Sequence, residues 1–114
     1  MRIGIIGYGF VGKALEAGIK NSVKIIKIDP ALNTCISNLE EFEPDICFIC
    51  VPTPMNDDGS QDISILREVI NDLKEISISS LIVLKSTVLP NYIHSIQEEI
   101  PELVFNPEFL RERS

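Results

Sequence analysis

Residues 1–14, MRIGIIGYGFVGKA, form the stretch that decides the fold of this chain. Arg2 to Ile6 is short, apolar and β-branched, which predicts a buried parallel strand. Beyond it, apolar and small residues recur at helical spacing, at Val11, Ala14, Leu15, Gly18 and Ile19. Between strand and helix, Gly7, Gly9 and Gly12 have the spacing G-x-G-x-x-G. This spacing predicts a sharp exit from the strand, a close approach of backbone to a pyrophosphate, and tight packing of the helix on the strand.

The glycine spacing alone does not identify a dinucleotide site, because a glycine-bearing turn also occurs in other α/β proteins. A dinucleotide site requires a carboxylate about twenty positions on, at the end of the second strand, to bind ribose hydroxyls. Val23 to Ile28 is the second strand candidate and Asp29 ends it, although Asp29 before Pro30 also suits a plain strand-end turn. Together the two signals favour a Rossmann dinucleotide site. A carboxylate there repels a 2′-phosphate, so NAD is expected rather than NADP.

Composition limits the remaining possibilities. With 114 residues and a formal net charge of −7, the chain is predicted to be one domain, residues 1–114, without a nucleic-acid or anionic-membrane partner. No apolar run reaches membrane-spanning length and no signal peptide is evident, so a cytoplasmic location is expected. Cys47 and Cys50 form a C-x-x-C pattern, but inside a strand candidate their side chains point to opposite faces. Cys47 and Cys50 are therefore predicted to be small buried hydrophobes, and with Cys35 the cysteine count is odd, so no metal is expected.

The rest of the chain alternates strand and helix candidates, which predicts a parallel, doubly wound α/β sheet in a single domain. After Asp29 we expect a short strand near 34–36 and a brief helix near 38–42. Further strands are predicted at 45–51, 80–84 and 103–105, and helices at 63–75 and 91–99. Asp62 is expected to cap the longer helix. The predicted buried stripe of this helix is Ile65, Leu66, Val69, Ile70 and Leu73.

In such sheets, ligands bind beyond the carboxyl ends of the strands. This sequence places there the glycine turn, Asp29, and the segments VPTP (51–54), KSTV (85–88) and NPEFL (106–110). Polar, glycine and proline residues are therefore concentrated where a ligand is expected to lie.

Four motifs resemble those of the nucleotide-sugar 6-dehydrogenases, such as UDP-glucose and UDP-N-acetylmannosamine dehydrogenases. They are GYGFVG (7–12), VPTPMNDDGSQDIS (51–64), KSTV (85–88) and NPEFLRE (106–112), in the family's order and over nearly the whole chain. The sequence is thus similar to the N-terminal NAD-binding domain of the UDP-glucose/GDP-mannose dehydrogenase family. The resemblance implies NAD as cofactor and a sugar nucleotide as substrate. In this family, two NAD-dependent oxidations turn a primary alcohol into a carboxylate through a cysteine-bound thioester.

The resemblance also implies a role for each matching residue. The pyrophosphate would lie on Gly7, Tyr8, Gly9, Phe10, Val11 and Gly12, the adenosine ribose on Asp29, and the middle of the cofactor along Val51, Pro52, Thr53 and Pro54. The nicotinamide half would lie beside Ser86, Thr87 and Val88, and Glu112 would also contact the cofactor. The implied catalytic groups are the Thr87 hydroxyl and the Glu108 carboxylate, and the implied sugar-nucleotide contacts are Glu108, Phe109, Leu110 and Arg111. From the residues alone, Thr87 also suits a strand-end cap, Glu108 a solvent-facing glutamate, and His94 a surface position without chemistry.

The sequence departs from the family pattern in three places. The region between Asp29 and Asp45 is short and lacks an arginine after Asp29, and Leu89 to Tyr92 replaces the usual residues after KSTV. None of the three cysteines matches the family's nucleophile, which lies with the active-site lysine in a later domain. We therefore expect an NAD-binding part of the enzyme that is inactive alone, with self-association or a further domain as its partner. The alternatives are a freestanding NAD-binding sensor or remnant and, less consistent with the motifs, a β-hydroxyacid dehydrogenase.

Overall fold

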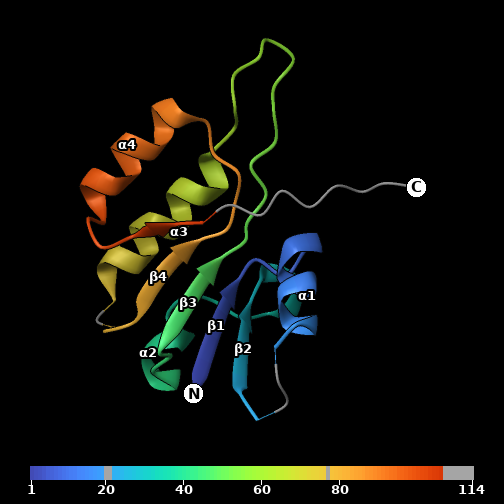
Figure 1. The fold of residues 1–114 in the computed structure, drawn as a ribbon, viewed down its shortest axis with the longest axis vertical. Coiled ribbons are helices and arrows are strands. Elements are labelled where there is room, and N and C mark those ends of the chain that lie inside the picture. Colours follow the sequence, from blue (N-terminus) through green and yellow to red (C-terminus); the bar gives the residue numbers. More distant parts are fainter. Residues whose placement is uncertain (20–21, 77, 107–114) are drawn as a thin grey trace.

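Five parallel strands form the central sheet of the computed structural model, which describes residues 1–19, 22–76 and 78–106 (Figure 1). The strands are β1 (Arg2–Ile6), β2 (Lys24–Ile28), β3 (Ile46–Ile49), β4 (Leu81–Leu84) and β5 (Val104–Phe105), in the order β2-β1-β3-β4-β5. β1 pairs with β2 on one side and with β3 on the other. The chain therefore reverses direction across the sheet between β1 and β3, and this switch point is where doubly wound sheets bind ligands.

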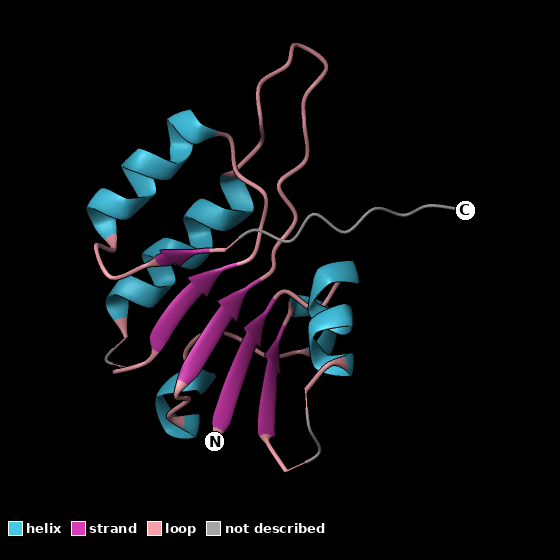
Figure 2. Ribbon diagram, viewed as in Figure 1, coloured by secondary structure: helices cyan, strands magenta, loops and turns pink. Residues whose placement is uncertain are grey.

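Helices cover both faces of the sheet (Figure 2). α1 (Phe10–Ala17) lies on one face, whereas α2 (Asn38–Phe42), α3 (Ser64–Glu75) and α4 (Pro90–Glu99) lie on the other. This arrangement confirms the predicted doubly wound α/β fold. None of the helices in the described part of the chain is both long and apolar enough to cross a membrane.

Two hydrophobic clusters follow from the alternation of side chains along the strands. The larger cluster joins Ile6, Ile49 and Leu84 of the sheet to α2, α3 and α4, and the smaller joins Ile3, Ile5 and Cys50 to the α1 side. Cys47 lies in the larger cluster, so the two cysteines of the C-x-x-C pattern are buried on opposite faces, as predicted.

The segment after β2 does not extend as a strand, so the strand predicted near 34–36 is wrong. A short 3-10 helix, η1 (Pro30–Leu32), is followed by Asn33 with φ +58°, a left-handed conformation that turns the chain. The Thr34 hydroxyl then donates to the Lys27 carbonyl at 2.7 Å and accepts from the Asp29 N–H at 2.9 Å. The segment thereby folds back on the end of β2, which stays an edge strand, and the predicted helix over 38–42 follows.

The start of α3 departs slightly from prediction. The helix begins at Ser64 and its N-cap residue is Ile63, so the predicted N-cap at Asp62 is one residue too early. The Asp62 carboxylate nevertheless accepts the Ser64 N–H at 2.9 Å. Four of the five predicted stripe residues are buried, whereas Ile65 is 44% exposed. Ile65 was wrongly placed in the core because helical spacing alone does not tell a core edge from a cavity rim.

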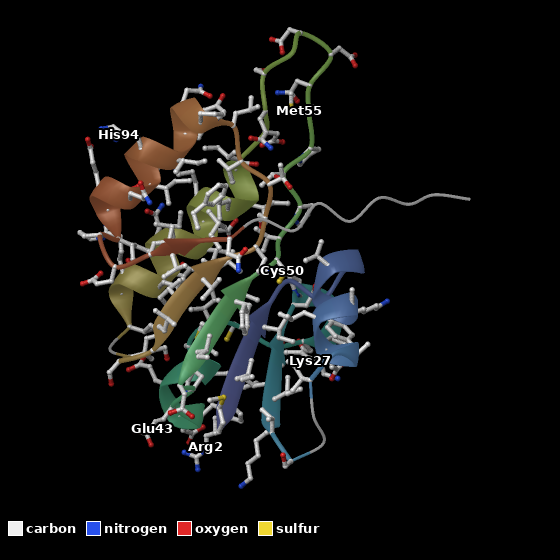
Figure 3. All side chains as sticks on the ribbon, viewed as in Figure 1. Arg2, Lys27, Glu43, Cys50, Met55 and His94 are labelled. Atoms are coloured by element: carbon white, nitrogen blue, oxygen red, sulfur yellow. The ribbon has the colours of Figure 1, made fainter. Side chains whose placement is uncertain are left out.

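A long loop, residues 52–62, projects beyond the carboxyl ends of β3 and β4 (Figure 1). Met55 lies on this loop, away from the sheet, and forms an isolated antiparallel bridge with Gln61 (Figure 3). The bridge narrows the loop at its base. This base also faces the corner after β4 and carries part of the candidate site.

Candidate dinucleotide-binding site

Two glycines of the turn are required by packing within the protein. Gly7 has φ +91°, and a Cβ added there would lie 2.9 Å from backbone atoms of Cys50 and Val51. A Cβ at Gly12 would lie 2.4 Å from the Gly7 carbonyl oxygen. No side chain fits at either position without moving backbone, so these glycines let the turn, α1 and the end of β3 come together.

Gly9 differs from both, because the fold itself does not require it. It is exposed, it precedes the first residue of α1, and a Cβ added there would meet no atom within 4 Å. The open space lies at the N-terminus of a helix, where unpaired N–H groups and the helix dipole favour an anion. The turn therefore has the room and the donors that a pyrophosphate needs.

Asp29 connects this turn to the end of β2. Its Oδ2 accepts the Tyr8 backbone N–H at 2.7 Å and its Oδ1 accepts the Ala31 N–H at 2.9 Å. A carboxylate has about four acceptor positions. Asp29 is thus held in place by backbone donors with acceptor capacity left for a ligand's hydroxyl groups.

The Tyr8 side chain is held by charged neighbours on the α1 side. Its hydroxyl bonds the Glu16 carboxylate, and Lys27 Nζ lies 3.3 Å from Glu16 Oε2 and 4.8 Å from the centre of the tyrosine ring. The hydrogen bond raises the pKa of Tyr8 and lowers the pKa of Glu16. Tyr8 is therefore a protonated donor to an ionised carboxylate near neutral pH.

A cavity of about 460 Å³ opens at the carboxyl ends of β1, β2 and β3. Its volume is in the range of small-molecule pockets. Gly7, Asp29, Val51 and Pro52 of the predicted site line it. The other lining residues are Ile6, Ile28, Pro30, Thr34, Cys35, Ile36, Ile65, Glu68, Val69 and Asp72, so the described walls are apolar with three carboxylates and no lysine or arginine.

Beyond the switch point, the loops after β3 and β4 are joined by hydrogen bonds. The Thr53 hydroxyl donates to the Thr87 carbonyl at 2.7 Å, and the buried Ser86 hydroxyl donates to the Val51 carbonyl at 2.8 Å. Val88 is buried in the larger hydrophobic cluster. Ser86 and Val88 thus support the corner from inside, whereas Thr87 is exposed.

Most of the predicted site residues gather at one edge of the sheet. They belong to the glycine turn, Asp29, the 51–54 segment and the 86–88 corner. Glu108, Phe109, Leu110, Arg111 and Glu112 lie outside the described residues.

Sequence reasoning missed the cavity walls, including Glu68 and Asp72, and the buried Gln61. For Glu68 and Asp72, the available signal was their spacing of one helical turn on α3, which places both carboxylates on one face, together with the third carboxylate at Asp29. Gln61 had no signal, since a glutamine beside a turn is usually exposed. His94 is exposed, with Nε2 3.2 Å from Glu98 Oε1.

Three features define a Rossmann-type dinucleotide-binding domain: a glycine turn at a helix N-terminus, a carboxylate at the end of the next strand, and a cavity at the switch point. A sequence model described as "UDP-glucose/GDP-mannose dehydrogenase family, NAD binding domain" matches residues 32–114. The chain belongs to this family, and NAD is the cofactor of its domain.

Relatives of known name agree with this family. UDP-glucose 6-dehydrogenase of Campylobacter jejuni is 28% identical over 149 residues, covering 100% of this chain and 38% of the relative. UDP-glucose 6-dehydrogenase of Rickettsia bellii is 38% identical over 86 residues, covering 69% of this chain and 20% of the relative. The protein YtcA of Bacillus subtilis is 31% identical and is covered to 36%. The chain thus spans little more than a third of the length of the curated relatives that it matches from end to end.

Solved structures share the fold. GDP-mannose dehydrogenase of Pseudomonas aeruginosa superposes with a TM-score of 0.64 at 23% identity, covering 98% of this chain and 37% of that one. UDP-glucose dehydrogenase of Pyrobaculum islandicum superposes with a TM-score of 0.62 at 25% identity, covering 99% and 37%.

Proposed function

We propose that this chain is the NAD-binding part of a nucleotide-sugar 6-dehydrogenase, which oxidises the primary alcohol of a UDP- or GDP-sugar to the uronic acid. The observation that carries the proposal is Gly9, which leaves an open space at a helix N-terminus beside the ordered Asp29 carboxylate. The packing around the turn does not call for a glycine at this position. A ligand that brings phosphates against the backbone does.

The proposed placement of NAD follows the sheet order. The pyrophosphate lies on residues 7–12, the adenosine ribose on Asp29, the adenine in the cavity beyond Asp29, and the middle of the cofactor along Val51 and Pro52. A dinucleotide placed in this way crosses the switch point. Its nicotinamide half therefore lies over the ends of β3 and β4, near Thr53 and Thr87.

The charge of the cavity supports NAD over NADP. Asp29, Glu68 and Asp72 line it, without a basic side chain among the described lining residues. A 2′-phosphate on the ribose would carry additional negative charge toward these carboxylates, which raises the free energy of the complex. The adenosine diol, in contrast, can donate hydrogen bonds to Asp29.

The proposal assigns the complete reaction to a longer assembly. Cys47 and Cys50 are buried and Cys35 lines the adenine end of the cavity, so no cysteine of this chain is offered to a substrate beside Thr87. The thioester stage would need a cysteine and a lysine from elsewhere. Some expectations stay predictions, namely the roles of Thr87, Glu108, residues 109–111 and Glu112. Self-association and a cytoplasmic location also stay predictions, which light scattering and cell fractionation, respectively, would test.

The test is a titration with NAD followed by thermal unfolding. A ligand at a hundred times its dissociation constant adds about 2.7 kcal/mol to the free energy of unfolding. We expect a concentration-dependent rise in Tm with NAD and a smaller one with NADP. Absence of any rise at millimolar NAD would contradict the proposal. Formation of the uronic acid from NAD and UDP-glucose is expected to be absent for the chain alone, and its presence would contradict the assignment of the nucleophile to another segment.

A further inference from the structure

Gln61 is a buried polar side chain that the proposed NAD site does not explain. It is 7% exposed although it follows the exposed residues of the projecting loop. Glutamine is mostly found at protein surfaces, and burying its amide is unfavourable unless hydrogen bonds replace the lost water. The structure supplies those bonds.

The Gln61 amide connects three backbone groups from two loops. Nε2 donates to the Thr53 carbonyl at 3.0 Å and to the Thr87 carbonyl at 2.8 Å. Oε1 accepts the Leu89 N–H at 2.9 Å. Both N–H groups and the oxygen of the amide are therefore used. One side chain thus binds the loop after β3 to the corner after β4.

The Thr87 carbonyl is where these bonds converge. It accepts from Gln61 Nε2 and, at 2.7 Å, from the Thr53 hydroxyl. On the far side of the corner, Leu89 precedes the first residue of α4. The peptide that carries Thr87 is thereby fixed both to the neighbouring loop and to the start of α4.

We propose that Gln61 is a positioning residue, which sets the separation of the β3 and β4 loops beneath the nicotinamide half of NAD. This inference rests on the proposed function. Because the bonds of Gln61 lie beyond the switch point, its effect is confined to the nicotinamide half. The adenosine half, held by the glycine turn and Asp29, does not depend on it.

The experiment compares NAD with ADP-ribose, which lacks the nicotinamide, on wild type and on Gln61→Met by calorimetric titration. Methionine keeps the size of the side chain and removes its donors and acceptor. We expect NAD to bind about tenfold more weakly and ADP-ribose to change by less than about twofold. The matched control is Asn56→Leu in the same loop, whose side-chain amide bonds Ser60 within the loop, and both affinities should be unchanged.

Equal weakening of both ligands by Gln61→Met, or a lower Tm with both affinities intact, would show a structural role only and overturn the inference. Should Gln61→Met fail to fold, Gln61→Glu serves instead. It keeps the acceptor for Leu89 and loses both donors, so the same loss for NAD alone is expected, and an unchanged NAD affinity overturns the inference. Failure of wild type to bind either ligand contradicts the proposed function itself, and the two failures are therefore distinguishable.

Discussion

The backbone N–H of Tyr8 points at the Asp29 carboxylate, with 2.7 Å between the nitrogen and Oδ2. The middle of the glycine turn is thus bonded to the end of the neighbouring strand, 21 residues away in sequence. One carboxylate both orders the turn and remains available to a ribose. Under the proposed function, structural order and ribose binding are coupled at this residue.

Replacement of Asp29 by alanine should therefore lower both stability and NAD affinity. Two backbone donors lose their charged acceptor, which costs about 1–3 kcal/mol in the free energy of unfolding. The preference for NAD over NADP should also shrink. Asp45→Ala is the control, since Asp45 Oδ2 accepts the Arg2 N–H at 2.8 Å at the opposite end of the sheet. If both variants lose stability but Asp29→Ala keeps wild-type NAD affinity, Asp29 has no role in binding.

The three glycines of the turn should respond differently to alanine. Gly12→Ala and Gly7→Ala should unfold the chain or lower Tm strongly, because their Cβ atoms would overlap backbone. Gly9→Ala should change the free energy of unfolding by no more than about 1 kcal/mol, since the position is open. It should nevertheless weaken NAD binding at least tenfold, an estimate of roughly 1.4 kcal/mol. Calorimetric titration of a folded Gly9→Ala variant with unchanged affinity would contradict the phosphate role of this turn.

Cys35 gives a chemical readout of the cavity. It is the exposed one of the three cysteines and it lines the cavity, whereas Cys47 and Cys50 are buried and burial raises the pKa of the Cys47 thiol. A maleimide should therefore label the native chain once, at Cys35, and NAD should slow this reaction. The Cys35→Ser variant should not be labelled when native. A labelling rate that does not change with NAD would place the adenine outside the cavity.

Acid should weaken the contact between α3 and α4. Glu99 of α4 pairs with Lys74 at 3.3 Å and with Arg67, and hydrogen bonds from Lys74 and then Arg67 lower its pKa below the ordinary 4.5. A carboxyl group whose pKa is lowered by folding stabilises the folded state when the pH is above the pKa of the group in the unfolded chain. This contribution disappears as the pH falls through the pKa of the group in the folded chain. Glu99→Gln should lower the free energy of unfolding by about 0.2–1 kcal/mol near neutral pH.

The same difference should disappear as the pH falls through the lowered pKa of Glu99, because the wild-type carboxyl then also becomes neutral. Glu98→Gln next to it is the control, because Glu98 pairs with His94 where both side chains are largely exposed. Chemical denaturation across the pH range measures both. A deficit of Glu99→Gln that persists at acid pH would mean that packing, not charge, connects the helices.

Most of the sheet was predictable because each strand is a short apolar run bounded by turn residues. The helix at 38–42 was predictable from Pro44, before which a helix must end. The strand at 34–36 was not, since Thr34 and Ile36 are good strand residues locally. What decides the conformation there is the Thr34 hydroxyl, which bonds Lys27 and Asp29. A side chain that competes for backbone partners overrides local propensity.

The arrangement of the candidate site was predictable where glycine spacing and strand ends determine it, at residues 7–12 and at Asp29, whereas its role in binding stays a prediction. Its cavity walls were not, because Glu68 and Asp72 read as the solvent face of a helix and Ile65 as its core. Their positions depend on how α3 lies over the sheet, which periodicity does not report. Gln61 was missed for the same reason. Its burial depends on two loops that meet only in the folded chain.

The strand order also bears on how the chain is made. β2 and β3 pair with β1, β4 pairs with β3, and β5 pairs with β4. Every strand after the first thus joins a partner that precedes it in sequence. Because synthesis proceeds from the N-terminus, each new strand emerging from the ribosome meets a finished edge and need not wait for a later one. Parallel pairing is slow when partners are far apart, and this order of assembly shortens the search.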